Sequence, residues 1–401
     1  MNNIRWTRRL FPMAILVTGL LGGASRVVAQ ETVLWNFCVN SSCTDGDFPD
    51  GGLIADGAGN LYGTTEAGGA NGQGSVFEIP VGGGLRTLYS FCAQQGCPDG
   101  AAPYGGALVF DSSGNLFGTT SSYGKGGGTV FELSPAGGGA WTFNTLYKFC
   151  SLPKCADGQY PNGQLAILGS NKLVGTTTGG HGVLFQLLQT QPSVWTETVV
   201  YRFCSRVNCA DGSDPTGLSV DRVGNLYGTT RGGGAHNGGT VFEIPLNGAQ
   251  AVLYSFCPVA GCADGLAPTG GVILANGLLY GTTEDGGANG KGTLYSLHQG
   301  VETVLHNFGV GLDGTLPVST LVDSLGNLYG TTSSGGAHNG GTVFEIPFNG
   351  AETVLYSFCG LANCLDGSSP QFGPLLFLNG HLFGTTTGGG RYNGGTVFQI
   401  H

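Results

Sequence analysis

Charged residues are scarce in this sequence, at 10% of 401 residues, and Lys and Arg (15) are rarer than Asp and Glu (25). The first 29 residues hold four of the Arg and no acidic residue, which leaves 11 basic against 25 acidic residues, a net charge of −14, in the rest. Nucleic acids and anionic membrane surfaces bind basic patches. The composition therefore argues against both as partners.

A hydrophobic run long enough to cross a membrane is also missing. The N-terminal run from Phe11 to Leu21 has about half of the ~20 residues that a transmembrane helix needs. It follows a basic start and precedes small residues, an order typical of a secretory signal peptide. We therefore predict a signal peptide at 1–29, read by the general or the twin-arginine route, and a secreted or periplasmic mature chain at 30–401. The alternative is an uncleaved N-terminal anchor.

Glycine, by contrast, is abundant, with 77 residues. Gly-Thr-Thr occurs seven times at intervals of 49 to 57 residues, from 63–65 to 384–386. Within the copy at 207–256, runs of β-branched and aromatic residues alternate with Gly, Asn, Asp and Pro, and no helical periodicity is present. This pattern predicts four strands, A to D, at 217–221, 225–230, 240–244 and 251–256.

Four strands per repeat of this length are typical of a β-propeller blade, with an open β-solenoid as the alternative. The two ends of the chain distinguish these folds. Residues 32–37 match strand D, whereas residues 395–400 match strand C, so the first strand supplies what the last copy lacks. A solenoid would instead need capping units at both ends. We predict an all-β, seven-bladed propeller over 30–401, in which strand 32–37 completes the blade formed by about 371–401.

The repeat unit itself resembles a known family. The order GNLYGTT, then GGAxNGGTVFEIP, then TVLYSF is similar to the GloVer tandem-repeat family of exported bacterial proteins, and the resemblance covers about residues 32–401. It implies location more than chemistry. Family members often carry a C-terminal anchor, but this sequence stops at His401 inside the last strand, so we expect an exported product without an anchor.

Twelve cysteines form six C-x4-C pairs, each after a strand D and before an Asp-Gly. The seventh such loop, after Phe308, has lost both cysteines together, as partners in a bond should be lost. In an exported protein this spacing predicts disulfides, although C-x4-C also lies within zinc-ligand spacing. The predicted disulfides are Cys38–Cys43, Cys92–Cys97, Cys150–Cys155, Cys204–Cys209, Cys257–Cys262 and Cys359–Cys364.

The loop between strands D and A carries Asp-Gly in every copy, at Asp45, Asp99, Asp157, Asp211, Asp264, Asp313 and Asp366. In a propeller this loop and the B–C loop emerge on one face, around one mouth of the channel. The carboxylates could bind a cation, a sugar or a basic segment there. However, a feature present in every copy is more often part of the fold, and Asp commonly caps its own turn.

Residues that differ between the copies are better candidates for a ligand site on that face. They are Asp47 and Asp50 beside Asp45, together with Tyr123, Lys125, Arg231, His236, Glu284, Asp285, His338, Arg391 and Tyr392. The segment Asp45 to Asp50 weakly resembles a calcium loop, which needs several oxygens at short spacing. We therefore expect no cofactor, with calcium as the one candidate ion.

Strand C carries a recurring acid within Val-Phe-Glu-Ile, at Glu78, Glu132, Glu243 and Glu345. Both faces of a blade pack against neighbouring blades, so these carboxylates need hydrogen-bond partners. The Thr pair of strand B is the expected donor, for instance Thr229 or Thr230 to Glu243.

Catalytic signatures such as H-E-x-x-H and G-x-S-x-G are missing. We therefore expect a monomeric, non-enzymatic scaffold that binds a glycan or a protein at its loop-rich face. The alternative is a secreted hydrolase or lyase with a cation at the channel mouth, because propeller enzymes can scatter their catalytic groups over one face. A purely structural surface component is a third possibility.

Overall fold

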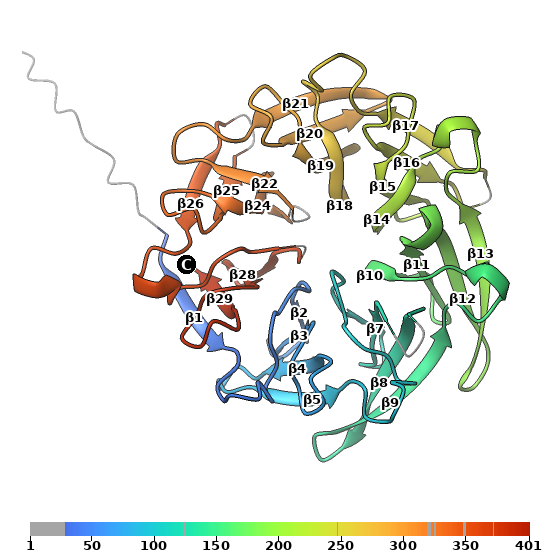
Figure 1. Ribbon diagram of the computed structural model, residues 1–401, viewed down its shortest axis with the longest axis vertical. Helices are drawn as coiled ribbons and strands as arrows, with labels where there is room; N and C mark the ends of the chain where they lie inside the picture. The colour runs from blue at the N-terminus through green and yellow to red at the C-terminus, as the bar shows by residue number, and fades with distance from the viewer. Residues whose placement is uncertain are drawn as a thin grey trace, which may run out of the picture.

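The computed structural model describes residues 29–122, 126–246, 248–318, 322–324, 326–347, 350–371 and 373–401. Seven antiparallel sheets are arranged around a central channel, with each strand A nearest the axis and each strand D at the rim (Figure 1). The predicted seven-bladed propeller is confirmed. The predicted signal peptide lies almost wholly outside the described residues and stays a prediction.

The strands of blades one to three follow the chain in the order A to D. They are β2 (Ile54–Ala55), β3 (Leu61–Thr65), β4 (Ser75–Ile79) and β5 (Arg86–Ser90); β6 (Val109–Phe110), β7 (Leu116–Thr120), β8 (Thr129–Gly137) and β9 (Ala140–Lys148); and β10 (Pro161–Ile167), β11 (Lys172–Thr177), β12 (Val183–Gln191) and β13 (Val194–Arg202).

Blades four to six continue this order. They are β14 (Ser213–Val220), β15 (Leu226–Gly232), β16 (Thr240–Ile244) and β17 (Ala251–Ser255); β18 (Leu266–Ala275), β19 (Leu278–Asp285), β20 (Thr293–His298) and β21 (Val301–Asn307); and β22 (Gly314–Pro317) with β23 (Val322–Ser324), β24 (Asn327–Gly335), β25 (Thr342–Ile346) and β26 (Thr353–Ser357). Four short 3-10 turns are η1 (Pro153–Cys155), η2 (Gly179–His181), η3 (Val207–Cys209) and η4 (Ala362–Cys364).

Blade seven closes the ring with strands from both ends of the chain. β27 (Leu376–Leu378), β28 (His381–Thr386) and β29 (Thr396–Ile400) are followed in the sheet by β1 (Glu31–Asn36). β1 runs antiparallel to β29, pairing Glu31 with Ile400 and Asn36 with Thr396. The predicted closure is confirmed, and Figure 1 shows the blue N-terminal strand beside the red C-terminal one.

The blades are joined by a repeated aromatic contact. The Phe that follows each strand D is buried and packs against an aromatic ring on strand C of the next blade, with centroids 4.8 to 5.1 Å apart. Each such pair is worth about 0.5–1.5 kcal/mol beyond its buried area. The seven pairs are Phe37–Phe77, Phe91–Phe131, Phe149–Phe185, Phe203–Phe242, Phe256–Tyr295, Phe308–Phe344 and Phe358–Phe398.

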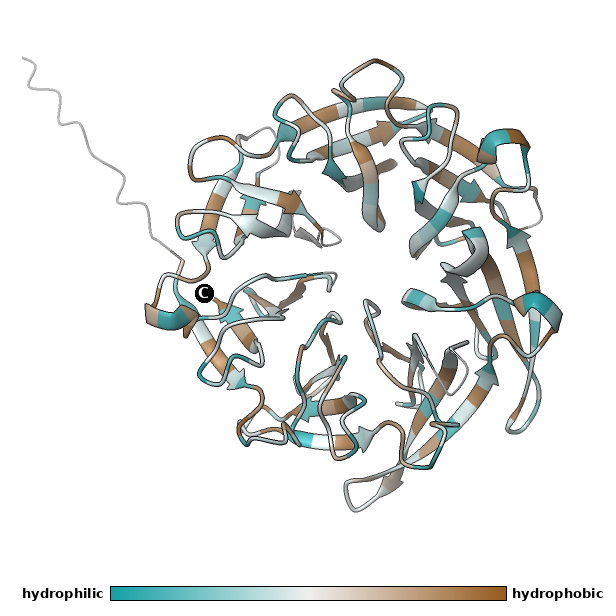
Figure 2. Cartoon of the chain, viewed as in Figure 1, coloured by the Kyte–Doolittle hydropathy of each residue, from teal (hydrophilic) through white to brown (hydrophobic). Residues whose placement is uncertain are grey.

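The strand-C ring also explains the Gly of Gly-Thr-Thr. A Cβ on Gly228 would lie 2.6 Å from the ring of Phe242, so strand B can pass over that ring only without a side chain. Figure 2 shows hydrophobic bands along the strands, alternating with paler and hydrophilic ones.

The expected donor to the strand-C acids was wrong. Tyr227 lies directly opposite Glu243 and donates its hydroxyl at 2.9 Å, whereas Thr230 lies opposite Thr240 and shares a hydrogen bond with it at 2.8 Å. The cross-strand register decides this pairing, because residues in register are the ones whose side chains meet on one face. In blade two the corresponding residue is Phe117, which has no hydroxyl to donate.

Candidate functional site

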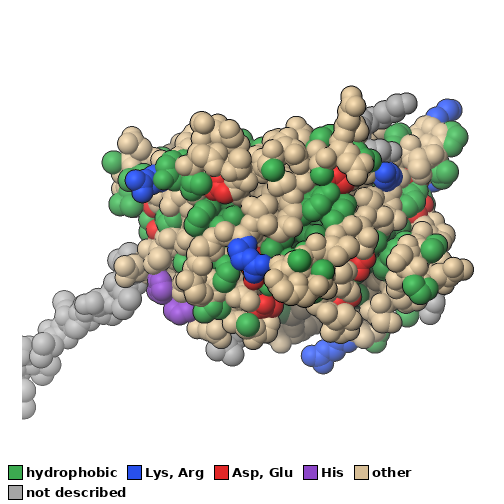
Figure 3. Space-filling view, turned by 90° about the horizontal axis from the view of Figure 1, so that it is seen from below, with side chains coloured by type: hydrophobic (Ala, Val, Ile, Leu, Met, Phe, Trp, Pro, Cys, Tyr) green, Lys and Arg blue, Asp and Glu red, His purple; other side chains and the backbone are tan. Residues whose placement is uncertain are grey.

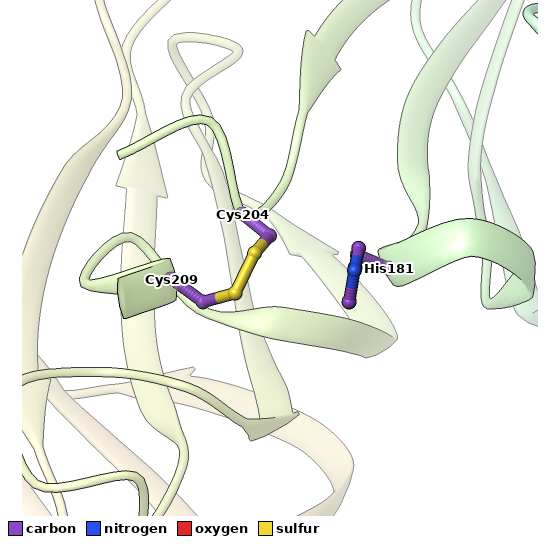
Figure 4. A group of neighbouring side chains, drawn as sticks. All are labelled: His181, Cys204 and Cys209. Carbon is purple, nitrogen blue, oxygen red and sulfur yellow. A yellow bond between two sulfur atoms is a disulfide. The ribbon is translucent and has the colours of Figure 1, made fainter. Parts of the chain in front are cut away.

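All six predicted disulfides are present, and the described residues contain no free cysteine. The sulfurs are therefore not available as zinc thiolates. In blade three, for example, His181 lies within 4.8 Å of the sulfurs of Cys204 and Cys209, but these are joined to each other (Figure 4). Six disulfides are typical of an oxidising compartment. No helix among the described residues is long and apolar enough to span a membrane.

The repeated Asp of the D–A loop is buried in five blades and half-buried in two, and it serves the fold. Its carboxylate accepts hydrogen bonds from a side chain near the end of the preceding strand D and from a backbone N–H of its own loop. Tyr201, for example, donates to Asp211 at 2.7 Å, and the N–H of Ser205 donates at 2.9 Å. The side-chain donors are Trp35, Tyr89, Tyr147, Tyr201, Tyr254, His306 and Tyr356. Capping accounts for the recurrence of this Asp in every copy.

The predicted cluster of Asp45, Asp47 and Asp50 is split. Asp45 accepts from Trp35 and from the N–H of Val39, and Asp47 accepts from the N–H of Phe48. Asp50 lies further along the loop and is 2% exposed. Among the described residues, neither Asp45 nor Asp50 belongs to a group of three side chains close enough to share a metal.

The D–A and B–C loops share one face, as predicted, since the N–H of Gly69 donates to the carbonyl of Cys43 across them. On this face the predicted site residues form two groups: an outer tier at the tips of the loops and an inner tier around the central channel. His236, His338, Arg391 and Tyr392 are exposed at the tips of B–C loops, where Arg391 stacks over Tyr392 at 5.5 Å. They belong to three different blades, four, six and seven. Tyr123 and Lys125 lie outside the described residues.

The inner tier surrounds the end of the central channel, which we call the channel mouth. A cavity of about 520 Å³ opens there between blades two to five, with Pro374 of blade seven on its wall. Its polar lining includes Tyr104, Asn162, Thr178, Asp214, Thr216, Arg231 and Thr269. Most of these residues occupy two repeat positions: the one after the Pro that starts strand A, and the one after Gly-Thr-Thr. The first position carries six residue types over the seven blades, and the second carries Glu, Ser, Thr or Arg.

Arg231 is held at the mouth by an ion pair with Glu284, with Nη2 and Oε2 2.5 Å apart. The two residues follow Gly-Thr-Thr in adjacent blades, so the structure brings two predicted site residues together. Asp285 comes next in the chain, pairs with Leu266 across the sheet and is half-buried.

Asp50 and Tyr104 occupy the position after the Pro in blades one and two, and they interact. Burial and then the charges of Asp50, Glu66 and Glu284 raise the pKa of the Tyr104 hydroxyl to about 12, while Arg231 opposes the rise. These five residues therefore form one electrostatic group, which we call the mouth cluster. Sequence reasoning missed Tyr104 and Glu66, although they occupy the same repeat positions as Asp50 and Arg231.

Asp50 is the most perturbed member of the mouth cluster. Burial and the neighbouring Glu66 raise the pKa of its carboxyl to about 7, and the backbone N–H of Gly105 lowers it only in part. Neither of its oxygens has a hydrogen-bond partner of good geometry. Burial also raises the pKa of Glu66. A buried carboxylate without partners is costly for stability, and such groups concentrate at functional sites.

A family model described as the Gloeobacter/Verrucomicrobia repeat matches residues 27–185, 97–263 and 259–401. The chain belongs to this repeat family. Its seven repeats thus form one propeller, and the mouth cluster lies where those repeats differ. No curated protein matches the sequence.

Solved structures with a similar fold share little sequence with this repeat protein. The extracellular domain of a proposed hybrid two-component system from B. thetaiotaomicron matches at 12% identity with a TM-score of 0.55, over 88% of this chain and 38% of that one. A proposed gluconolactonase matches at 12% identity and TM-score 0.43, over 94% and 92% of the two chains. A proposed 6-phosphogluconolactonase from Bacteroides fragilis matches at 17% and 0.48, over 75% and 82%. At these identities the likeness concerns the fold alone.

Proposed function

We propose that this protein is an exported propeller that binds a short glycan at the channel mouth. One observation carries the proposal: polar side chains that differ from blade to blade converge on a single cavity, whereas the residues common to all blades serve the fold. A volume of about 520 Å³ lies within the range of small-molecule sites, and it would hold one or two sugar rings.

The chemistry of the lining suits a polyhydroxylated ligand. Asn162, Thr178 and Thr216 offer amide and hydroxyl groups, and Asp214 offers a carboxylate acceptor. Tyr104 adds an aromatic face with a polar tip. On the side of the molecule drawn in Figure 3, acidic and basic side chains are scattered among polar and apolar ones.

Glycan binding can be tested on an array of bacterial and plant glycans, followed by calorimetry on any hit. We expect Asn162→Ala and Asp214→Ala to weaken binding at least about 10-fold, as the loss of one hydrogen bond to a charged or buried group would. The matched control is His236→Ala, an exposed loop-tip change on the same face, which should leave binding unchanged. Binding that survives both mouth variants, or a protein ligand held by the loop tips, would refute the proposal.

A second candidate is a hydrolase or lyase acting on a sugar derivative. Asp50 favours it, because a carboxyl group with a pKa near 7 can act as a general acid or base at neutral pH. In this second candidate function, the carboxylates of Asp50 and Glu66 would be the ligands of a calcium ion. Turnover of chromogenic glycosides or sugar lactones that is lost in Asp50→Asn would support it, and a chelator would show whether the ion is needed.

A further inference from the structure

The loop between blades five and six departs from the other six D–A loops in three ways. Asp313 follows Phe308 by only five positions, against eight in each of the other loops. The loop also lacks the disulfide, and the aromatic donor of its strand D is His306, where five other blades have Tyr and one has Trp. Gly309 occupies the position of the first cysteine and takes a positive φ of 98°, as the cysteines of the other loops do. The positive φ at this position is therefore kept, although the covalent link is lost and the loop is shorter.

Three side chains meet at this loop. A ring nitrogen of His306 and carboxylate oxygens of Asp313 and Glu352 all lie within 4.8 Å of one another. They come from three places: His306 from β21 of blade five, Asp313 from the D–A loop, and Glu352 from the residue before β26 of blade six. The group therefore spans the junction of two adjacent blades.

The burial of the group suits an ion. The side chain of Asp313 is 7% exposed, and that of His306 is 23% exposed, which leaves one side open to solvent. Asp313 Oδ2 lies 2.9 Å from His306 Nε2 and accepts from the N–H of Gly309, but its buried Oδ1 has no hydrogen-bond partner. The Oδ1 atom of Asp313 therefore has a lone pair that no donor occupies, and it lies beside the carboxylate of Glu352 and the imidazole of His306.

We propose that His306, Asp313 and Glu352 bind one zinc-like divalent cation that links blades five and six where the disulfide is missing. Imidazole nitrogen and carboxylate oxygen are both zinc ligands, and a site with three protein ligands keeps water in the fourth position. Zinc bonds of about 2.0–2.2 Å at tetrahedral angles place ligand atoms about 3.3–3.5 Å apart. His306 Nε2 and Asp313 Oδ2 would then separate by only about 0.5 Å from their present 2.9 Å.

Three sister junctions show what is particular to blade six. The same three repeat positions hold Tyr147, Asp157 and Glu197 in one, Tyr254, Asp264 and Glu302 in another, and Tyr356, Asp366 and Glu31 in the third. All three keep the disulfide and the Tyr–Asp hydrogen bond. A simple His–Asp ion pair in blade six would replace that Tyr–Asp bond, and it would need neither Glu352 nor a cation. The cation site and the simple ion pair therefore make different predictions: only the cation site makes stability depend on metal and requires Glu352.

The test uses the full mature protein, oxidised and stripped of metal with chelator. We expect calorimetry with zinc chloride to show one site per chain and the melting temperature to rise with zinc. His306→Tyr restores the residue of the sister junctions and keeps a donor to Asp313, so it should fold and yet weaken zinc binding at least about 10-fold. Glu352→Gln should weaken binding similarly, because it replaces a ligand that belongs to the first coordination sphere.

The rings of His381 and His401 lie 4.8 Å apart and could also bind zinc, so His381→Phe is the matched control. The proposal predicts that this variant keeps the blade-six site. It is overturned if wild-type protein shows no zinc binding at tens of micromolar zinc, or if His306→Tyr binds as tightly as wild type. It is also overturned if His381→Phe alone removes all binding. None of these outcomes depends on whether the channel mouth binds a glycan.

Discussion

Replacing Asp50 by Asn should stabilise the protein at alkaline pH and have little effect at acidic pH. Burial and the neighbouring Glu66 raise the pKa of the Asp50 carboxyl to about 7 in the folded chain, from its ordinary value of 3.8. A folded-state pKa raised above the unfolded value means that the folded chain holds its proton more tightly. Stability is then fully present below about pH 4, and it is lost as the pH rises through 7.

The size of the effect follows from the difference between a pKa of 3.8 and one of about 7, because a tenfold change in proton affinity corresponds to about 1.36 kcal/mol. Wild-type protein should therefore lose about 4 kcal/mol between pH 4 and pH 8 through this one group, which is 2% exposed and so poorly screened. Asn cannot ionise and avoids the loss. With an unfolding entropy of about 2.1 cal/mol/K per residue, 4 kcal/mol corresponds to about 5 °C for a chain of this size.

The assay is thermal unfolding by circular dichroism of wild type and Asp50→Asn from pH 4 to pH 8.5. The difference in melting temperature should grow from about zero to about 5 °C, with its midpoint between pH 5 and 7. Asp221→Asn is a control of opposite sign: burial raises the pKa of Asp221, but hydrogen bonds from Asn225 and Val223 lower it more. Parallel pH curves for wild type and Asp50→Asn would refute the reasoning.

Three further predictions concern the junctions between blades. Replacing Cys204 and Cys209 together by Ala should cost about 2 kcal/mol, since each disulfide closes a very short loop, and denaturant unfolding measures the loss. Tyr254→Phe should cost about 1.5–3 kcal/mol, because it removes a hydrogen bond of 3.0 Å to the carboxylate of Asp264; an unchanged denaturation midpoint would contradict this. Glu302→Gln should raise the melting temperature more at pH 8 than at pH 5, because burial and the charge of Asp264 raise the pKa of Glu302 to about 7. Thermal unfolding of both proteins across this pH range measures the difference, and parallel curves would contradict the prediction.

The fold could be predicted from the sequence because the repeated motifs show where each blade begins and ends. Gly228 recurs because it lies against Phe242, and strand 32–37 matches strand D because it fills that place in blade seven. The cysteine pairs were equally readable, since residues five apart across one loop have few other partners. Such features depend on local geometry that every copy repeats.

The candidate site was only partly predictable, for a geometric reason. Arg231 and Glu284 were found because they differ from their counterparts, but His236 differs in the same way and lies alone at a loop tip. Whether a variable position faces the channel or the outer rim depends on how the strands tilt around the ring. Glu66 and Tyr104 were missed because only the closed ring brings blades one, two, four and five to a common mouth.

The pairing of β1 with β29 also has a consequence for how the protein folds. The partner strands of blade seven are separated by almost the whole chain, so their contact carries the largest loop-closure entropy in the molecule. Blades one to six can form from near neighbours, but the ring cannot close until residues 396–400 are available. Until then β1 and β28 both present unpaired edges, which are sites of aggregation. An exported chain that crosses a membrane from its N-terminus would therefore hold its first strand unpartnered longest, and closure of the ring would be its last folding step.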